Sequence, residues 1–188
     1  MKQVGYFTHS DCMSHNMGHM HPESPMRLDA INARLQAQGL MLDLAQFDAK
    51  SANLDLIERA HPRQYVHDIN QTWLDVTDGD LIPLDGDTSM GPGSLRAALL
   101  AAGAGWQAVD YVMADEIQRA FGATRPPGHH AEKSLAMGFC LFNNVAIAAL
   151  HAIEQHSLER VAIIDFDVHH GNGTVDIFEN DERVMVCS

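Results

Sequence analysis

The sequence predicts an α/β domain built on a parallel β-sheet. Short apolar runs alternate with longer stretches of helical character, and the runs lie at residues 4–7, 119–123, 161–166 and 184–187. Runs that are apolar throughout are typical of strands in a parallel sheet with both faces covered by helices. Polar clusters follow two of these runs directly. Because ligands bind at the carboxyl ends of parallel strands, a functional site is predicted at that edge of the sheet.

The first elements are a strand at residues 4–7 and a loop that extends to His21 and is rich in His and Met. Ser24 and Pro25 are typical of the start of a helix, and Gly39 is typical of its end. The N-terminal part of the chain is therefore expected to place one helix between the first strand and the next element.

Further helices are predicted over residues 61–74, 144–156 and 175–178, and two Asp-Gly-Asp sequences mark a turn-rich loop at residues 78–87. A long helix is expected to begin at Ser94. Its many Ala and Gly residues indicate close packing against a sheet.

Composition narrows the class of protein. The 188 residues are 46% hydrophobic and show no internal repeat, which predicts a single domain over residues 1–188. The net charge of −13, from 12 basic and 25 acidic residues, and the lack of a Lys or Arg run argue against direct nucleic-acid binding. The three cysteines are widely spaced, and no signal sequence or membrane-spanning segment is recognisable. We therefore expect a reducing, cytoplasmic compartment.

The sequence Asp-Phe-Asp-Val-His-His-Gly-Asn-Gly at residues 165–173 carries the strongest chemical signal. In an extended strand, side chains two residues apart point to the same side, so Asp165, Asp167 and His169 are expected to converge. Carboxylate and imidazole suit Zn²⁺, whose catalytic sites usually have three protein ligands and a water. Asp167 and His169 supply two ligands, and Asp165 is placed to orient a histidine or to hold a second, harder cation.

A second cluster, Arg-Pro-Pro-Gly-His-His at residues 125–130, follows another predicted strand. His129 and His130 are adjacent, so both reach one site only if the chain turns sharply, which Gly128 permits. Histidine is the commonest general base near neutral pH. Paired histidines are more often structural, but two such pairs at two strand ends favour a common site, with Phe139 as an aromatic wall.

These motifs resemble the signature segments of the zinc-dependent histone deacetylase family, particularly its class II-like and bacterial members. The resemblance is carried by residues 21–28, 125–130, 138–144 and 165–174 and extends over essentially the whole chain. It implies a three-layer arginase-deacetylase fold with a central parallel sheet. It also implies hydrolysis of an acetyl amide to acetate and a free amine.

By resemblance, His130 is the general base that later protonates the leaving amine. His129 is its electrostatic partner and is hydrogen-bonded to Asp165. Asn172 orients His130, and asparagine at this position is the class II-like residue where other members carry aspartate.

The resemblance also implies the metal and substrate contacts. Asp167 and His169 are zinc ligands. Asp165, Asp167, the carbonyl of His169 and Ser188 resemble the potassium site of the family. Phe139 lines the acyl-lysine tunnel, while Gly138 offers a backbone contact to the substrate.

The family takes a third zinc ligand, an aspartate, and a carbonyl-polarising residue, usually tyrosine, from segments that this sequence does not contain. The chain is therefore expected to be the N-terminal part of a longer catalytic domain or a truncated product, with a fold that is incomplete at its C-terminus. A parallel sheet interrupted in this way exposes an apolar edge strand, which favours self-association as a homo-oligomer.

Two alternatives stay open beside deacetylation of acetyl-lysine. Within enzymes, the substrate is an acetylpolyamine, a cationic molecule that an acidic surface would attract. In a different class, the chain is a non-catalytic module that binds metal or a partner without turnover.

Overall fold

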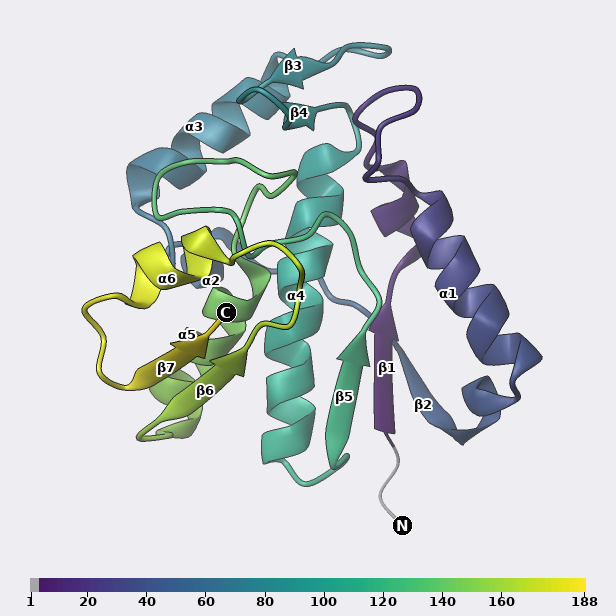
Figure 1. Cartoon of the computed structure of the whole chain (residues 1–188), viewed down its shortest axis with the longest axis vertical. Helices are drawn as coiled ribbons and strands as arrows, with labels where there is room; N and C mark the ends of the chain where they lie inside the picture. The colour runs from purple at the N-terminus through teal and green to yellow at the C-terminus, as the bar shows by residue number, and fades with distance from the viewer. Residues whose placement is uncertain (1–3) are drawn as a thin grey trace.

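The computed structural model describes residues 4–188, in which strands and helices alternate around parallel sheets (Figure 1). The strands are β1 (Val4–Thr8), β2 (Leu44–Asp48), β3 (Ile82–Pro83), β4 (Ser89–Met90), β5 (Arg119–Gly122), β6 (Val161–Ile164) and β7 (Val184–Cys187). The helices are α1 (Met26–Ala37), α2 (Leu54–Ile57), α3 (Arg63–Leu74), α4 (Ser94–Met113), α5 (Asn144–His156) and α6 (Asn172–Phe178), with 3₁₀ turns η1 (Ser10–Ser14) and η2 (Leu40–Asp43). The predicted α/β class is confirmed.

Parallel pairing is confirmed for the predicted strands, whereas β3 and β4, which the sequence did not predict, pair antiparallel. One sheet has the order β2-β1-β5, with Val4 opposite both Leu44 and Arg119. A second sheet pairs β6 with β7 in parallel, and Val161 lies opposite Val184. Parallel neighbours require crossover connections, which the intervening helices provide.

Strand β1 lies between two helical layers. Tyr6 and Phe7 are both buried and, as neighbours in a strand, point to opposite faces. The Tyr6 hydroxyl donates to Oδ1 of Asn32 on α1. Phe7 stacks on Phe47 at 4.8 Å between ring centroids and meets Tyr111 of α4 edge-on at 5.8 Å. The layers are therefore α1, sheet and α4, as the three-layer expectation requires.

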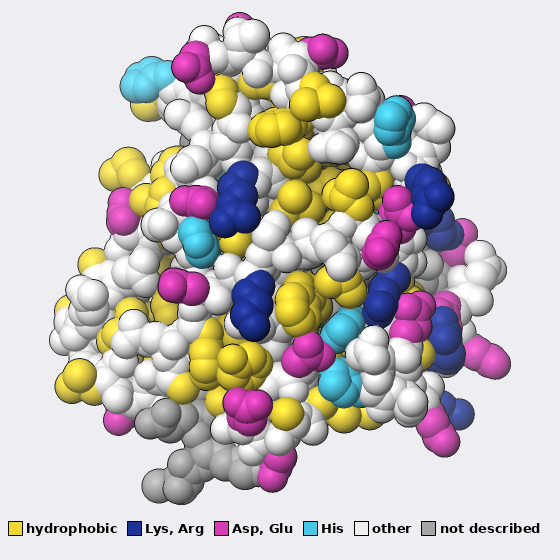
Figure 2. Space-filling view, turned by 180° about the vertical axis from the view of Figure 1, so that it is seen from behind, with side chains coloured by type: hydrophobic (Ala, Val, Ile, Leu, Met, Phe, Trp, Pro, Cys, Tyr) yellow, Lys and Arg dark blue, Asp and Glu magenta, His cyan; other side chains and the backbone are white. Residues whose placement is uncertain are grey.

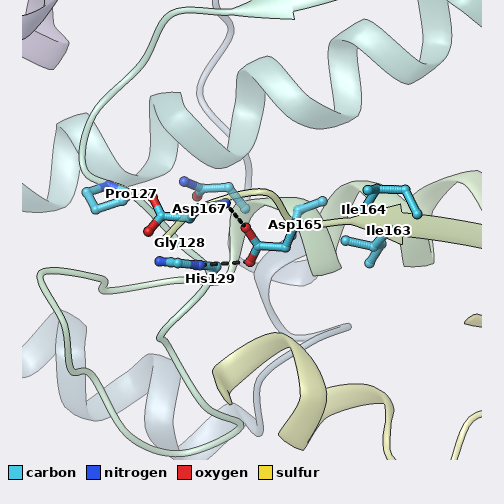
Figure 3. Close-up of a pocket in the computed structure, with 9 residues that line it drawn as sticks. Pro127, Gly128, His129, Ile163, Ile164, Asp165 and Asp167 are labelled. Carbon is cyan, nitrogen blue, oxygen red and sulfur yellow. Dashed lines mark hydrogen bonds and ion pairs between the residues drawn. The ribbon is translucent and has the colours of Figure 1, made fainter. Parts of the chain in front are cut away.

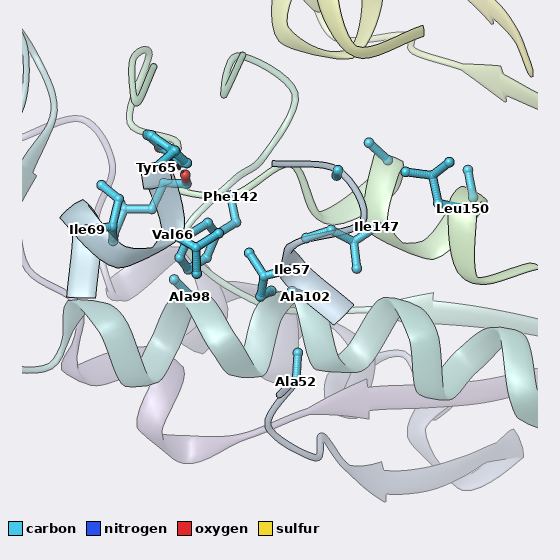
Figure 4. Close-up of a cluster of buried hydrophobic side chains, with 14 of the residues drawn as sticks. Ala52, Ile57, Tyr65, Val66, Ile69, Ala98, Ala102, Phe142, Ile147 and Leu150 are labelled. Atoms are coloured by element: carbon cyan, nitrogen blue, oxygen red, sulfur yellow. Dashed lines mark hydrogen bonds between the residues drawn. The ribbon is translucent and has the colours of Figure 1, made fainter. Parts of the chain in front are cut away.

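Small side chains let α4 pack closely, as its composition predicts. Ala98 and Ala102 are buried against the larger side chains of Ile57, Phe142 and Ile147 (Figure 4). This cluster joins α4 to α3 and α5 and supports the loops that carry the site. At the start of α5, the side chain of Asn143 accepts a hydrogen bond from Ala146 N at 3.1 Å and caps the helix.

Several sequence expectations need correction. The expectation that helices cover both faces of every strand is wrong for β5, whose four residues are all exposed. Strand β5 is also an edge strand, because β6 belongs to a different sheet and is not its neighbour among the described residues. The predicted loop after β1 contains η1, and β2 and α2 were not predicted. Cys187 at the end of β7 is exposed, whereas Cys140 is buried.

The helices and the surface charge bear on the expected environment of the protein. None of the helices formed by residues 4–188 combines the length and the apolar character needed to span a membrane. On the face shown in Figure 2, Lys and Arg side chains lie beside acidic ones, with hydrophobic side chains between them.

Candidate active site

The two predicted motifs meet although they follow strands of different sheets. The segment after β5 carries His129, and the segment after β6 carries Asp165. Nδ1 of His129 lies 2.8 Å from Oδ2 of Asp165 (Figure 3). Both side chains are mostly buried, with 16% and 14% of their surface exposed. Asp165 therefore orients a histidine, one of the two roles that the sequence allowed for it.

His130 has a different support. Its Nδ1 lies 2.7 Å from Oδ1 of Asn172, the first residue of α6. The rings of His129 and His130 are 4.0 Å apart, so both histidines reach one site, as predicted. Gly128 contributes by close approach rather than by an unusual backbone angle, since a Cβ there would lie 2.6 Å from Asn144 N.

Residues 165–170 converge by a different route from the one expected. The strand ends at Ile164, so alternation along an extended strand does not place these side chains. Instead the chain bends, and Oδ1 of Asp167 lies 3.1 Å from Nδ1 of His169. The His169 backbone N–H donates to the same oxygen and, together with the ring, lowers the pKa of the Asp167 carboxyl. Both side chains are open to solvent, at 50% and 73% exposure.

The predicted residues line a common pocket of about 310 Å³. His129, His130, Phe139, Asp167 and His169 all contribute to its wall. A neighbouring hollow of about 290 Å³, drawn in Figure 3, shares His129 and Asp167 with it and has an apolar side at β6. The structure therefore brings these predicted residues together in one place.

The loop with Gly138 and Phe139 is fixed by residues that sequence reasoning missed. Both have positive φ angles, +55° and +70°. Gly138 N donates to Asp87 Oδ1 at 3.2 Å, and Phe139 N donates to Thr88 Oγ1 at 2.9 Å. The ring of His21 packs edge-on against Phe139 at 4.7 Å. The available signal was the second Asp-Gly-Asp turn, which the sequence marked only as a loop.

Arg125 anchors the N-terminal segment beneath the site and was not assigned a role from sequence. It is fully buried, and Nε donates to Glu23 Oε1 at 2.7 Å. Nη1 donates to the carbonyls of Cys12 and His15, each at 2.8 Å. Burial lowers the pKa of the nearby His15 to about 3. Arg27 lines the pocket and donates to Thr124 O at 2.9 Å.

Ser188 lies beside the second motif, as the potassium expectation requires. Its Oγ accepts a hydrogen bond from Gly171 N at 2.8 Å. This contact ties the end of β7 to the loop that carries Asp165. It does not identify an ion.

A second group of potential metal ligands lies between α4 and α5. Nε2 of His151 and Nε2 of His156 each lie 2.7 Å from Oδ1 of Asp110. Arg59 Nη1 lies 3.3 Å from Nδ1 of His151. A guanidinium only donates, so His151 carries its proton on Nε2, and a metal there would force a proton onto Nδ1 against the arginine. The hydrogen-bond donors and acceptors of these side chains are therefore matched without a metal ion.

Comparison with known proteins agrees with these motifs. Residues 21–188 match the sequence model of the histone deacetylase domain. The chain is 39% identical over 169 residues to polyamine deacetylase HDAC10 of Homo sapiens, which covers 88% of this chain and 25% of the relative. It is 38% identical over 168 residues to a histone deacetylase-like amidohydrolase of Pseudomonas aeruginosa, covering 89% of this chain and 43% of the relative.

A solved structure shares the fold. The crystal structure of the HDA15 HD domain superposes with a TM-score of 0.92 at 32% identity, over 99% of this chain and 53% of that one. The chain thus spans about a quarter to about half of the length of these three proteins.

Proposed function

The chain belongs to the histone deacetylase family, and from this premise we propose that its site hydrolyses an acetyl amide to acetate and a free amine. The observation that carries the proposal is the pair of supported histidines beside Asp167 and His169 in one pocket. A histidine with one nitrogen held and the other free in a pocket is equipped for general acid-base catalysis.

The donor atoms near the pocket fit zinc. Oδ1 of Asp167 and Nδ1 of His169 are 3.1 Å apart, and two ligand atoms of one tetrahedral zinc lie about 3.3 Å apart. With the ring proton of His169 on Nε2 rather than on Nδ1, these two atoms would be able to hold zinc together. When bound, zinc supplies polarisation of the acetyl carbonyl and a more acidic water. Potassium near Asp165 and Ser188 remains a prediction from the family resemblance.

The chain's own residues provide the proton transfers. His130 donates its Nδ1 proton to Asn172, which leaves the Nε2 lone pair to accept a proton from the attacking water. The same nitrogen then returns that proton to the departing amine nitrogen. His129 is held by a full carboxylate, and such a charge-assisted hydrogen bond stabilises positive charge beside His130 during the transfer.

Phe139 and Gly138 are proposed to hold the substrate. Phe139 offers an apolar surface to the methylene chain of an acylated amine, and the fixed loop around Gly138 offers backbone contact. Asp87 lies exposed at the rim of the same pocket. Its carboxylate would attract a substrate that carries positive charge beyond the acetylated nitrogen.

The substrate is therefore acetyl-lysine or an acetylpolyamine. Asp87 and the net charge of −13 favour a cationic amine, and a polyamine deacetylase is among the relatives. Steady-state turnover by the zinc-loaded chain on an acetyl-lysine peptide and on an acetylpolyamine tests the proposal. His130→Ala and Asp167→Ala should each abolish turnover. A folded, zinc-bound chain that turns over neither substrate would support the non-catalytic module instead.

A further inference from the structure

The amide of Asn172 has a neighbour that the proposed reaction does not use. Its Oδ1 faces His130, while its Nδ2 lies 2.9 Å from Oε1 of Glu132 and 3.3 Å from Sδ of Met137. Glu132 therefore ends a chain of two hydrogen bonds that begins on the imidazole of His130.

The chemistry of these groups fixes the direction of both hydrogen bonds. An ionised carboxylate only accepts, and a thioether is a weak acceptor. The Asn172 atom that faces Glu132 and Met137 must therefore be the NH₂ group, and the amide oxygen must face His130. An oxygen accepts, so Nδ1 of His130 carries the proton and Nε2 keeps its lone pair.

Backbone contacts hold Glu132 and Asn172 in one unit. Glu132 N donates to Leu135 O at 3.0 Å. The next residue, Lys133, donates its backbone N–H to Oδ2 of Asp176 at 2.8 Å. Asp176 and Asn172 are both on α6, so the segment with Glu132 is attached to the same helix as the amide it contacts.

Without an acceptor at residue 132, only the weak acceptor Sδ of Met137 would favour one orientation of the Asn172 amide. Turned over, it would present its NH₂ group to His130 and select the tautomer with the proton on Nε2. That tautomer has no lone pair on Nε2 to accept a proton from water. The tautomer of His129 does not depend on such an orientation, because the ionised carboxylate of Asp165 can only accept a hydrogen bond.

We propose that Glu132 is a positioning residue that holds the amide of Asn172 in the orientation that selects the Nδ1–H tautomer of His130. The consequence for turnover rests on the proposed deacetylase function. The tautomer itself is a property of the folded chain and is measurable without substrate.

The test is nitrogen NMR of the histidine side chains in the ¹⁵N-histidine-labelled chain, at an alkaline pH where imidazole is neutral. The unmodified chain should show His130 with a protonated Nδ1, and a protonated Nε2 would overturn the proposal directly. Glu132→Gln retains an acceptor but adds an NH₂ group that would also pair with a turned-over Asn172 amide, so it should shift the tautomer ratio less than Glu132→Ala does. Glu132→Ala should change the tautomer ratio by at least about tenfold, the effect of losing a hydrogen bond to a charged group.

Glu182→Ala is the matched control, because Glu182 is exposed and lies outside the pocket. If Glu132→Ala does not fold, Glu132→Leu keeps the side-chain volume and removes the acceptor. The proposal fails if a folded variant without the acceptor keeps the tautomer ratio of the unmodified chain, or if Glu132→Gln shifts it as far as Glu132→Ala.

Turnover separates this proposal from the function on which it rests. In an active chain, Glu132→Ala should lower kcat about 10- to 100-fold, the range for partners that orient a catalytic group, with KM nearly unchanged. Glu132→Gln should retain more of kcat than Glu132→Ala does. No turnover by the unmodified chain would refute the proposed function, and the NMR measurement would still decide the role of Glu132.

Discussion

Replacing Gly138 with alanine tests whether the substrate loop packs directly on the proposed base. Gly138 has a φ of +55°, and a Cβ there would lie 2.5 Å from Cγ and 2.7 Å from Cβ of His130. Carbon atoms in contact are normally at least about 3.5 Å apart. The imidazole or the loop must therefore move by about 1 Å to admit one methyl group.

Two costs add at this position. Left-handed backbone costs a residue with a Cβ about 1–2 kcal/mol. Displacement of the ring also strains its hydrogen bond to Asn172, which contributes about 1 kcal/mol. We expect Gly138→Ala to lower the free energy of unfolding by about 2–4 kcal/mol. A base displaced by about 1 Å should lower turnover about 100-fold.

Gly39 provides a matched control. Its φ is +71°, and no atom lies within 4 Å of a Cβ built there, so Gly39→Ala carries the backbone cost alone. Urea unfolding of both variants separates the two costs, and turnover on an acetyl-lysine peptide reports the position of the base. Equal losses of stability, together with unchanged turnover in Gly138→Ala, would refute the packing of Gly138 on His130.

Three further predictions follow from burial and charge. Asp167→Ala should weaken zinc binding at least about tenfold in a chelator competition. It should change the unfolding free energy by less than about 0.5 kcal/mol, since the Asp167 side chain is half exposed. Lost stability with unchanged zinc affinity would contradict the ligand role. Glu23→Gln leaves the buried Arg125 without its counter-charge and should cost about 3–5 kcal/mol in urea unfolding; a cost below about 1 kcal/mol would show that the pair is hydrated. Burial lowers the pKa of His61 to about 4, so between pH 6.5 and 4 the unfolded chain binds a proton there that the folded chain does not, and His61 alone should lower the unfolding free energy by about 2–3 kcal/mol by about pH 4.5. Buried His15, with a pKa of about 3, should add a loss of similar size over the same range. His61→Gln should flatten that part of the pH profile, and an equally steep profile would exclude His61 as its source.

The sequence predicted the elements whose signals are local. Helix α5 begins and ends where its apolar pattern places it, and β1, β5 and β7 lie within a residue of their predicted runs. Strand β2 was missed because Leu44–Asp48 mixes polar and apolar residues. Its place in the sheet comes from pairing with β1 rather than from its own pattern.

The chemistry of the site was also local in part. Residues 125–130 and 165–173 place histidines and carboxylates after predicted strands, and these motifs carry much of the family resemblance. The partner of each histidine depends on the tertiary structure, because His129 and Asp165 are 36 residues apart and Asn172 is 42 residues from His130. Sequence alone proposed those pairs only through the resemblance.

Sequence by itself determined which residue types stand at the ends of the strands, because hydrophobic runs and turn residues act over a few positions. Only the tertiary structure decided how those residues are oriented. The bend after Ile164 turns Asp165 toward His129 and sets Asp167 beside His169. Glu132 contacts Asn172 because its segment is attached to α6, the helix that carries Asn172. A side chain's orientation is set by partners distant in the chain, and no local pattern contains them.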